Sequence, residues 1–138
     1  MKEEIEIWNL LHDGLLSLFI EYNSTAITAF VHIPYVRRRI EPVGVCFILK
    51  LSGVKSCTFK DFDGNEESIT KIFNSNSPDI LGVESKEMPI TISTTFGNLT
   101  LDYENINAYL ESGHEIDYKT ISKACSEYWE EWSIKSKA

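Results

Sequence analysis

Two segments of alternating apolar residues, separated by a short polar turn, lie near the start of this chain of 138 residues. Alternation with a period of two predicts a β-strand with one buried face, and a turn between two such strands predicts a hairpin. The segments cover residues 15–22 and 26–35, with the turn at 23–25. Their apolar faces consist of Leu16, Leu18, Ile20 and Tyr22 in the first segment and Ile27, Ala29, Val31 and Ile33 in the second.

Further strand patterns follow along the chain. Residues 43–52 form its most apolar stretch, with apolar side chains on both faces, which predicts a central strand. A strand at 54–62 leads into the turn dipeptide Asp63-Gly64, and shorter strands are predicted at 80–84, 90–94 and 99–103. We expect short helices at 66–73 and at 105–110.

The clearest helical pattern lies at the C-terminal end. Asp117 is a plausible N-cap, and apolar residues recur after it at spacings of four, three and four. This stripe consists of Ile121, Cys125, Tyr128 and Trp132. The spacing predicts an amphipathic helix that packs its aromatic stripe against a sheet.

These patterns predict an α+β fold in a single globular domain over residues 1–138. We expect a largely antiparallel sheet of about six or seven strands, with the C-terminal helix on one face. A β-sandwich with peripheral helices is the alternative. Hairpin signals identify neighbouring strands but leave the order of the strands open.

The net charge and the cysteine content indicate which binding partners and which cellular compartment to expect. The chain has 13 Lys and Arg against 21 Asp and Glu, a net charge of −8, which argues against nucleic-acid and membrane-surface binding. Its N-terminus lacks the pattern of a secretion signal, and its apolar runs are too short for a membrane helix.

Three widely spaced cysteines show no metal-binding or redox spacing, so we expect a cytoplasmic protein. They are Cys46, Cys57 and Cys125.

Every arginine of the chain lies in one block, Arg37, Arg38 and Arg39. Arginine presents a planar fork of donors suited to carboxylates and phosphates, so the block is a candidate binding surface together with Tyr35. The alternative is a charged strand end that discourages edge pairing. Trp129 extends the candidate surface, because it lies one step off the apolar stripe of the C-terminal helix.

No catalytic constellation and no cofactor site are predicted. His12-Asp13 shares only two letters with metal phosphohydrolases, and a turn explains it better. Residues 61–66 resemble the start of a calcium loop, but Glu66 replaces the required glycine and Ile72 the terminal glutamate. Cys46 lies in the most apolar strand and Cys125 on the apolar stripe of the C-terminal helix, where thiols are normally inert.

We therefore expect a small acidic protein that is not an enzyme and acts by binding another protein. Its charge favours a partner with a basic surface. In physical character it is similar to immunity proteins and other small inhibitors, although no motif identifies such a family. The alternatives are a binder of a small anionic ligand at the arginine block, and a structural homo-oligomer.

Overall fold

The computed structural model describes residues 2–21 and 25–137, which form four helices and ten strands. The helices are α1 (Glu3–Leu10), α2 (Pro34–Arg37), α3 (Ile69–Ser75) and α4 (Tyr118–Lys137). The strands are β1 (Leu15–Ile20), β2 (Ile27–His32), β3 (Cys46–Ser52), β4 (Ser56–Lys60), β5 (Glu66–Glu67), β6 (Ile80–Val83), β7 (Ile90–Thr94), β8 (Gly97–Asp102), β9 (Asn105–Tyr109) and β10 (Glu115–Ile116). The α+β class predicted from the sequence is confirmed.

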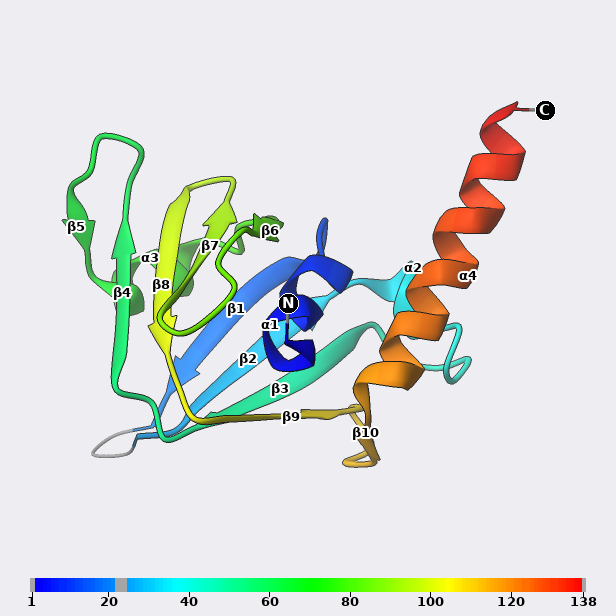
Figure 1. The fold of residues 1–138 in the computed structure, drawn as a ribbon, viewed down its shortest axis with the longest axis horizontal. Helices are drawn as coiled ribbons and strands as arrows, with labels where there is room; N and C mark the ends of the chain where they lie inside the picture. Colours follow the sequence, from blue (N-terminus) through cyan, green and yellow to red (C-terminus); the bar gives the residue numbers. More distant parts are fainter. Residues whose placement is uncertain (1, 22–24, 138) are drawn as a thin grey trace.

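The strands divide into two antiparallel sheets in place of one (Figure 1). The first sheet has the order β1-β2-β3-β9-β10, with the apolar strand β3 at its centre as predicted. The second sheet has the order β5-β4-β8-β7-β6. The expectation of about six or seven strands in one sheet therefore needs correction.

Two paired segments of the chain bend together from one sheet into the other, which explains why the strands divide in this way. Strand β3 continues into β4, and β8 into β9, through short connections that cross side by side from one sheet to the other. Lys55 N donates to Asp102 O at 2.7 Å and Glu104 N donates to Ser52 O at 3.0 Å, so the pairing persists through the bend. Gly53 adopts a φ of +65°, a left-handed conformation that allows the sharp change of direction.

The predicted N-terminal hairpin is confirmed. Strand β1 pairs with β2 in a register that places Leu16 opposite Val31 and Ile20 opposite Ile27. Leu16, Val31 and Ala29 are buried, so the alternating apolar face lies in the core except at the end of β1, where Ile20 is exposed. The predicted turn residues Asn23 and Ser24, like Tyr22, lie outside the described residues.

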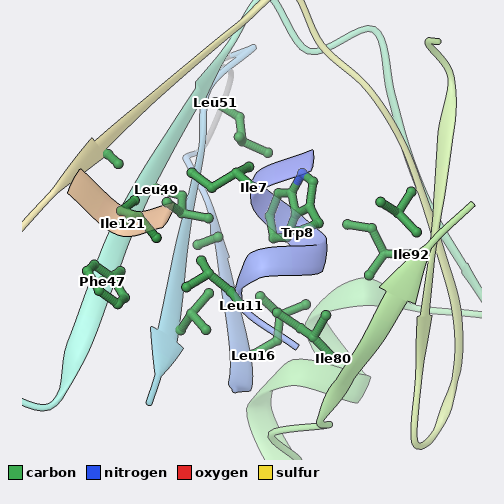
Figure 2. Close-up of a cluster of buried hydrophobic side chains, with 14 of the residues drawn as sticks. Ile7, Trp8, Leu11, Leu16, Phe47, Leu49, Leu51, Ile80, Ile92 and Ile121 are labelled. Atoms are coloured by element: carbon green, nitrogen blue, oxygen red, sulfur yellow. The ribbon is translucent and has the colours of Figure 1, made fainter. Parts of the chain in front are cut away.

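Helix α1 fills the space between the two sheets, and the sequence patterns did not predict it. Ile7, Trp8 and Leu11 project from its end into a cluster that both sheets line (Figure 2). Figure 2 shows Leu49 and Leu51 of the first sheet on one side of the cluster, and Ile80 and Ile92 of the second on the other. Trp8 is fully buried.

Of the two short helices expected, one is a strand and the other is present with shifted bounds. The segment expected as a helix at 105–110 is strand β9, because Ala108 pairs with Leu49 and Ile106 with Leu51 of the central strand. This pairing buries Ala108 against the core, which outweighs a weak local preference. The helix expected at 66–73 begins later, after Ser68, whose side chain caps it by accepting from Lys71 N.

Helix α4 begins where the sequence indicated. Asp117 Oδ1 accepts from Thr120 N at 2.8 Å, which is the N-cap bond. Ile121 and Cys125 are buried, and this half of the helix packs against α1 and the first sheet. The later turns extend away from the body (Figure 1). Among the helices of the described residues, none is long and apolar enough to cross a membrane.

Candidate functional site

The arginine block lies in and after α2, a short helix whose first residue is Pro34. Proline fixes φ near the helical value, so the chain turns here where strand alternation would have continued. Arg37 is 1% exposed, and its Nε donates to Glu111 Oε1 at 2.8 Å. The sequence placed Arg37 on a binding surface; the structure places it inside the protein, where it joins two loops.

Glu111 holds this buried guanidinium from the loop between β9 and β10. Its second oxygen accepts from Val45 N at 2.9 Å, so one carboxylate connects Arg37 to the start of β3. Burial alone raises the pKa of Glu111, but hydrogen bonds from the backbone of Val45 and Cys46 and the Arg37 charge together lower it. The carboxylate is therefore ionised, as the buried arginine requires.

The other two arginines reach the surface but are also engaged. Arg38 is exposed, and its Nε donates to Gly44 O at 3.2 Å. Arg39 forms an ion pair with Glu131 of α4 and lies over the ring of Tyr128, 5.7 Å from its centroid. All three guanidinium groups thus have partners within the chain.

An aromatic cluster lies beside Arg39 where α2 meets α4. It comprises His12, Tyr35, Tyr128, Trp129 and Trp132, joined by ring contacts with centroid distances of 4.5 to 5.9 Å. Burial, with smaller contributions from nearby acidic groups, raises the pKa of Tyr35 to about 12. The structure thus brings two of the predicted surface residues, Tyr35 and Trp129, into one cluster with Arg39.

One of the two expectations for the tryptophans of this cluster is confirmed and the other is wrong. Trp129 is partly buried, as expected: its ring stacks on His12 at 5.0 Å, and its Nε1 is buried without a hydrogen-bond partner. Trp132 was expected to pack against the sheet, yet it is 53% exposed. Trp132 belongs to the second half of α4, and the later turns of this helix extend away from the body (Figure 1).

A second surface feature is an acidic groove of about 710 Å³ between the first turn of α1, the start of α4 and the β9–β10 end of the first sheet. Its acidic members are Glu3, Glu4, Glu41, Glu115 and Asp117. Among the described residues that line it, none is Lys or Arg. The apolar part of its lining includes Ile7, Ile40, Ile106 and Ile116.

The sequence patterns did not predict this groove. Its carboxylates come from segments that are more than 100 residues apart at the extremes, Glu3 and Asp117, and only the fold brings them together. The one available signal was the acidic first turn of what proves to be α1, with Glu3, Glu4 and Glu6, of which the first two line the groove. Hydrogen bonds from the Thr120 side chain and backbone lower the pKa of Asp117, so this carboxylate is ionised.

The thiols are separate from the groove and unreactive in character. Burial raises the pKa of Cys57 and of Cys125 to about 11, and burial and then Glu111 raise the pKa of Cys46. A thiol in this state is a weak nucleophile near neutral pH. Within residues 2–21 and 25–137, no group of three or more His, Cys, Asp or Glu side chains is arranged to hold a metal ion.

Comparison of the chain with family models, with curated proteins and with solved structures finds no match.

Proposed function

We propose that this protein binds the basic surface of another protein through the acidic groove, without catalysing a reaction. The observation that supports the proposal is the arrangement of five carboxylates around one concavity, with no Lys or Arg among the described residues of its lining. Like charges held together in this way repel one another, and a Lys- or Arg-rich segment relieves the repulsion.

The lining suits such a segment in a second respect. Lys and Arg carry long methylene stems below their charged ends, and these stems pack on apolar surface. Isoleucine side chains provide that surface beside the carboxylates. The net charge of −8 adds a long-range field that accelerates encounter with a basic partner.

We further propose an inhibitor-like role in the cytoplasm. The raised pKa values of the three thiols favour a binding role over nucleophilic catalysis. All three cysteines are free thiols, which suits a reducing compartment. The alternative of an anionic ligand at the arginine block has less support, because the three guanidinium groups are engaged within the chain.

The proposal is tested by selecting binders from a library of random dodecapeptides and measuring their affinities. A groove variant combines Glu3→Gln, Glu4→Gln and Glu115→Gln. The matched control combines Asp63→Asn, Glu66→Gln and Glu87→Gln, exposed residues on or next to the second sheet. Both variants have the same net charge, three units less negative than the wild type.

We expect the selected peptides to be enriched in Lys and Arg. The groove variant should bind them at least tenfold more weakly than the control, a difference of about 1.4 kcal/mol. Peptides without basic enrichment would contradict the proposal. Equal weakening in both variants would also contradict it, since net charge and not the groove would then be responsible.

A further inference from the structure

The outer face of the first sheet carries exposed aromatic side chains among polar ones, and Ser77 lies at its edge, with its Oγ 3.2 Å from Ser17 Oγ. The core, α1 and the first half of α4 occupy its inner face, while the alternate residues of each strand face outward. Phe19 is 63% exposed and Phe30 is 39% exposed. The register places these outward residues in adjoining rows: Leu15, His32 and Cys46, then Ser17, Phe30, Ile48 and Tyr109, then Phe19, Thr28, Lys50 and Asn107.

This face differs in charge from the rest of the protein. Within β1, β2, β3 and β9 the outward residues in those three rows include no Asp or Glu, although the whole chain has 21 of them. The middle row continues to Glu115 of β10, which is opposite Tyr109. Lys50 lies among them, with its Nζ 4.8 Å from the centroid of the Tyr109 ring. Carboxylates border the face on several sides: Asp79 is bridged to Leu15, and Glu111 is paired with Arg37. Glu115 ends the middle row beside Tyr109, and Glu21 directly follows β1.

The face also combines a projection with a hollow. Phe19 projects from β1, while a hollow of about 360 Å³ lies further back along the same strand. Leu15 and Ser17 line it from β1 and Phe30 from β2. The remaining lining residues are His32, Cys46 and Ser77.

We propose that this face binds a second copy of the same chain, forming a symmetric dimer in which two first sheets pack face to face. An isologous interface requires each patch to complement itself, so that residue i contacts j and j contacts i. A two-fold axis that crosses β1 near Ser17 meets this requirement, because it brings Phe19 of each copy over the hollow of the other.

Charge selects a second copy over other partners. Two chains of net charge −8 repel each other through their acidic surfaces, and the repulsion is least where carboxylates are missing. The acidic groove would repel its own copy, whereas the outward residues of β1, β2 and β3 include one lysine and no Asp or Glu. The dimer does not depend on the proposed function, since the groove lies at the β9–β10 end and Phe19 on the opposite edge strand.

Sedimentation equilibrium over a micromolar concentration series tests the dimer. Phe19→Glu places a carboxylate at the centre of each contact, and Phe62→Glu is the matched control, because Phe62 is 70% exposed next to the second sheet. We expect a dimer for the wild type and for Phe62→Glu. Phe19→Glu should weaken dimerisation roughly 30-fold or more, as loss of a central aromatic anchor does.

A cross-link locates the interface independently of affinity. In a Cys46→Ser background, Ser17→Cys should form a disulfide-linked dimer on mild oxidation, because a residue at the two-fold axis meets its own copy. Ser56→Cys in the same background is exposed in the second sheet and should remain unlinked. A wild type that stays monomeric, or a dimer that is indifferent to Phe19→Glu, would overturn the proposal.

Discussion

Arg37 and Glu111 are 74 residues apart in the sequence, and their side chains meet at 2.8 Å with the guanidinium almost completely buried. The pair joins the end of α2 to the loop after β9. One member of the arginine block is therefore part of the framework that holds the central strand and its neighbour together. The first prediction follows from the cost of leaving such a charge without its partner.

Replacing Glu111 by Gln should destabilise the protein by about 2 kcal/mol. Removing one member of a buried ion pair costs roughly 3–5 kcal/mol, and the effect is smaller here because the Glu111 side chain is 33% exposed. Urea unfolding measures the difference. Glu41→Gln is the control, since Glu41 is 45% exposed and lies 3.7 Å from Arg37, and it should cost well under about 1 kcal/mol. Equal losses of stability in the two variants would show that the hydrogen bond from Arg37 Nε to Glu111 does not stabilise the protein more than the contact with Glu41.

The same pair predicts a dependence on acid pH. The pKa of Glu111 is lowered in the folded protein, so its contribution is present above the unfolded pKa of about 4.3 and is lost as the pH falls through the folded value. The wild type should therefore lose more stability between pH 5 and pH 3, roughly the range of ordinary carboxyl titration, than Glu111→Gln does. Urea midpoints at several pH values measure this. A constant difference between the two proteins would contradict the assigned ionisation.

The elements that were predicted well from the sequence are those whose partners are close by in the sequence. The β1–β2 hairpin joins adjacent segments, so its register follows from local alternation and a turn. Strand β9 was mistaken for a helix because its partner, β3, lies more than 50 residues earlier. Helix α1 was missed for a related reason: Trp8 and Leu11 are buried only because two sheets close around them.

Gly44 makes a second test of the Arg37–Glu111 pair possible. Its φ is +128°, and a Cβ there would lie 2.5 Å from Glu111 Oε1 and 2.6 Å from Arg37 Nη2. Gly64 has a φ of +85° with nothing within 4 Å of a Cβ, so Gly64→Ala measures the backbone cost alone, about 1–2 kcal/mol. Gly44→Ala should cost about 1–3 kcal/mol more, because the ion pair must also move. Thermal unfolding of both variants compares the costs, and similar losses would contradict the close contact.

Tyr103 predicts a loss of stability at alkaline pH. Its hydroxyl accepts from Trp8 Nε1 at 3.0 Å and donates to Glu4 O at 2.9 Å, and burial raises its pKa to about 12. A raised folded pKa gives stability that is complete below the unfolded value near 10 and is lost as the pH rises towards 12. That loss amounts to about 2–3 kcal/mol.

Tyr103→Phe separates the two parts of this effect. At neutral pH the variant should be less stable by about 1–3 kcal/mol, because the buried Trp8 N–H has lost its acceptor. Above pH 10, near the ordinary tyrosine pKa, its stability should fall less steeply than that of the wild type. Guanidinium unfolding at neutral and alkaline pH measures both. Parallel curves would show that Tyr103 does not titrate as assigned.

For the candidate surface, the spacing of residues in the sequence does not determine which side chains are buried. The block of arginines was visible in the sequence, but whether each one faces inward depends on α2, where Pro34 starts a helical turn. Likewise, the apolar spacing predicts which residues of α4 share a face. It does not predict how many turns of the helix have other parts of the protein to pack against. The acidic groove was invisible because its carboxylates come from α1, β10, the loop after α2 and the residue before α4.

The two tryptophans of α4 give the last prediction. Trp129 contacts His12, Tyr128 and Trp132, so Trp129→Ala removes the centre of the aromatic cluster and should cost about 2 kcal/mol, less than for a core tryptophan. Trp132 is 53% exposed, so Trp132→Ala should change the free energy of unfolding by less than about 0.5 kcal/mol. Urea unfolding gives both values, and acrylamide quenching of the remaining fluorescence should fall markedly only in Trp132→Ala, since that variant loses the accessible indole. A larger destabilisation by Trp132→Ala than by Trp129→Ala would mean that the apolar stripe packs as its spacing suggested and that α4 does not extend past the body.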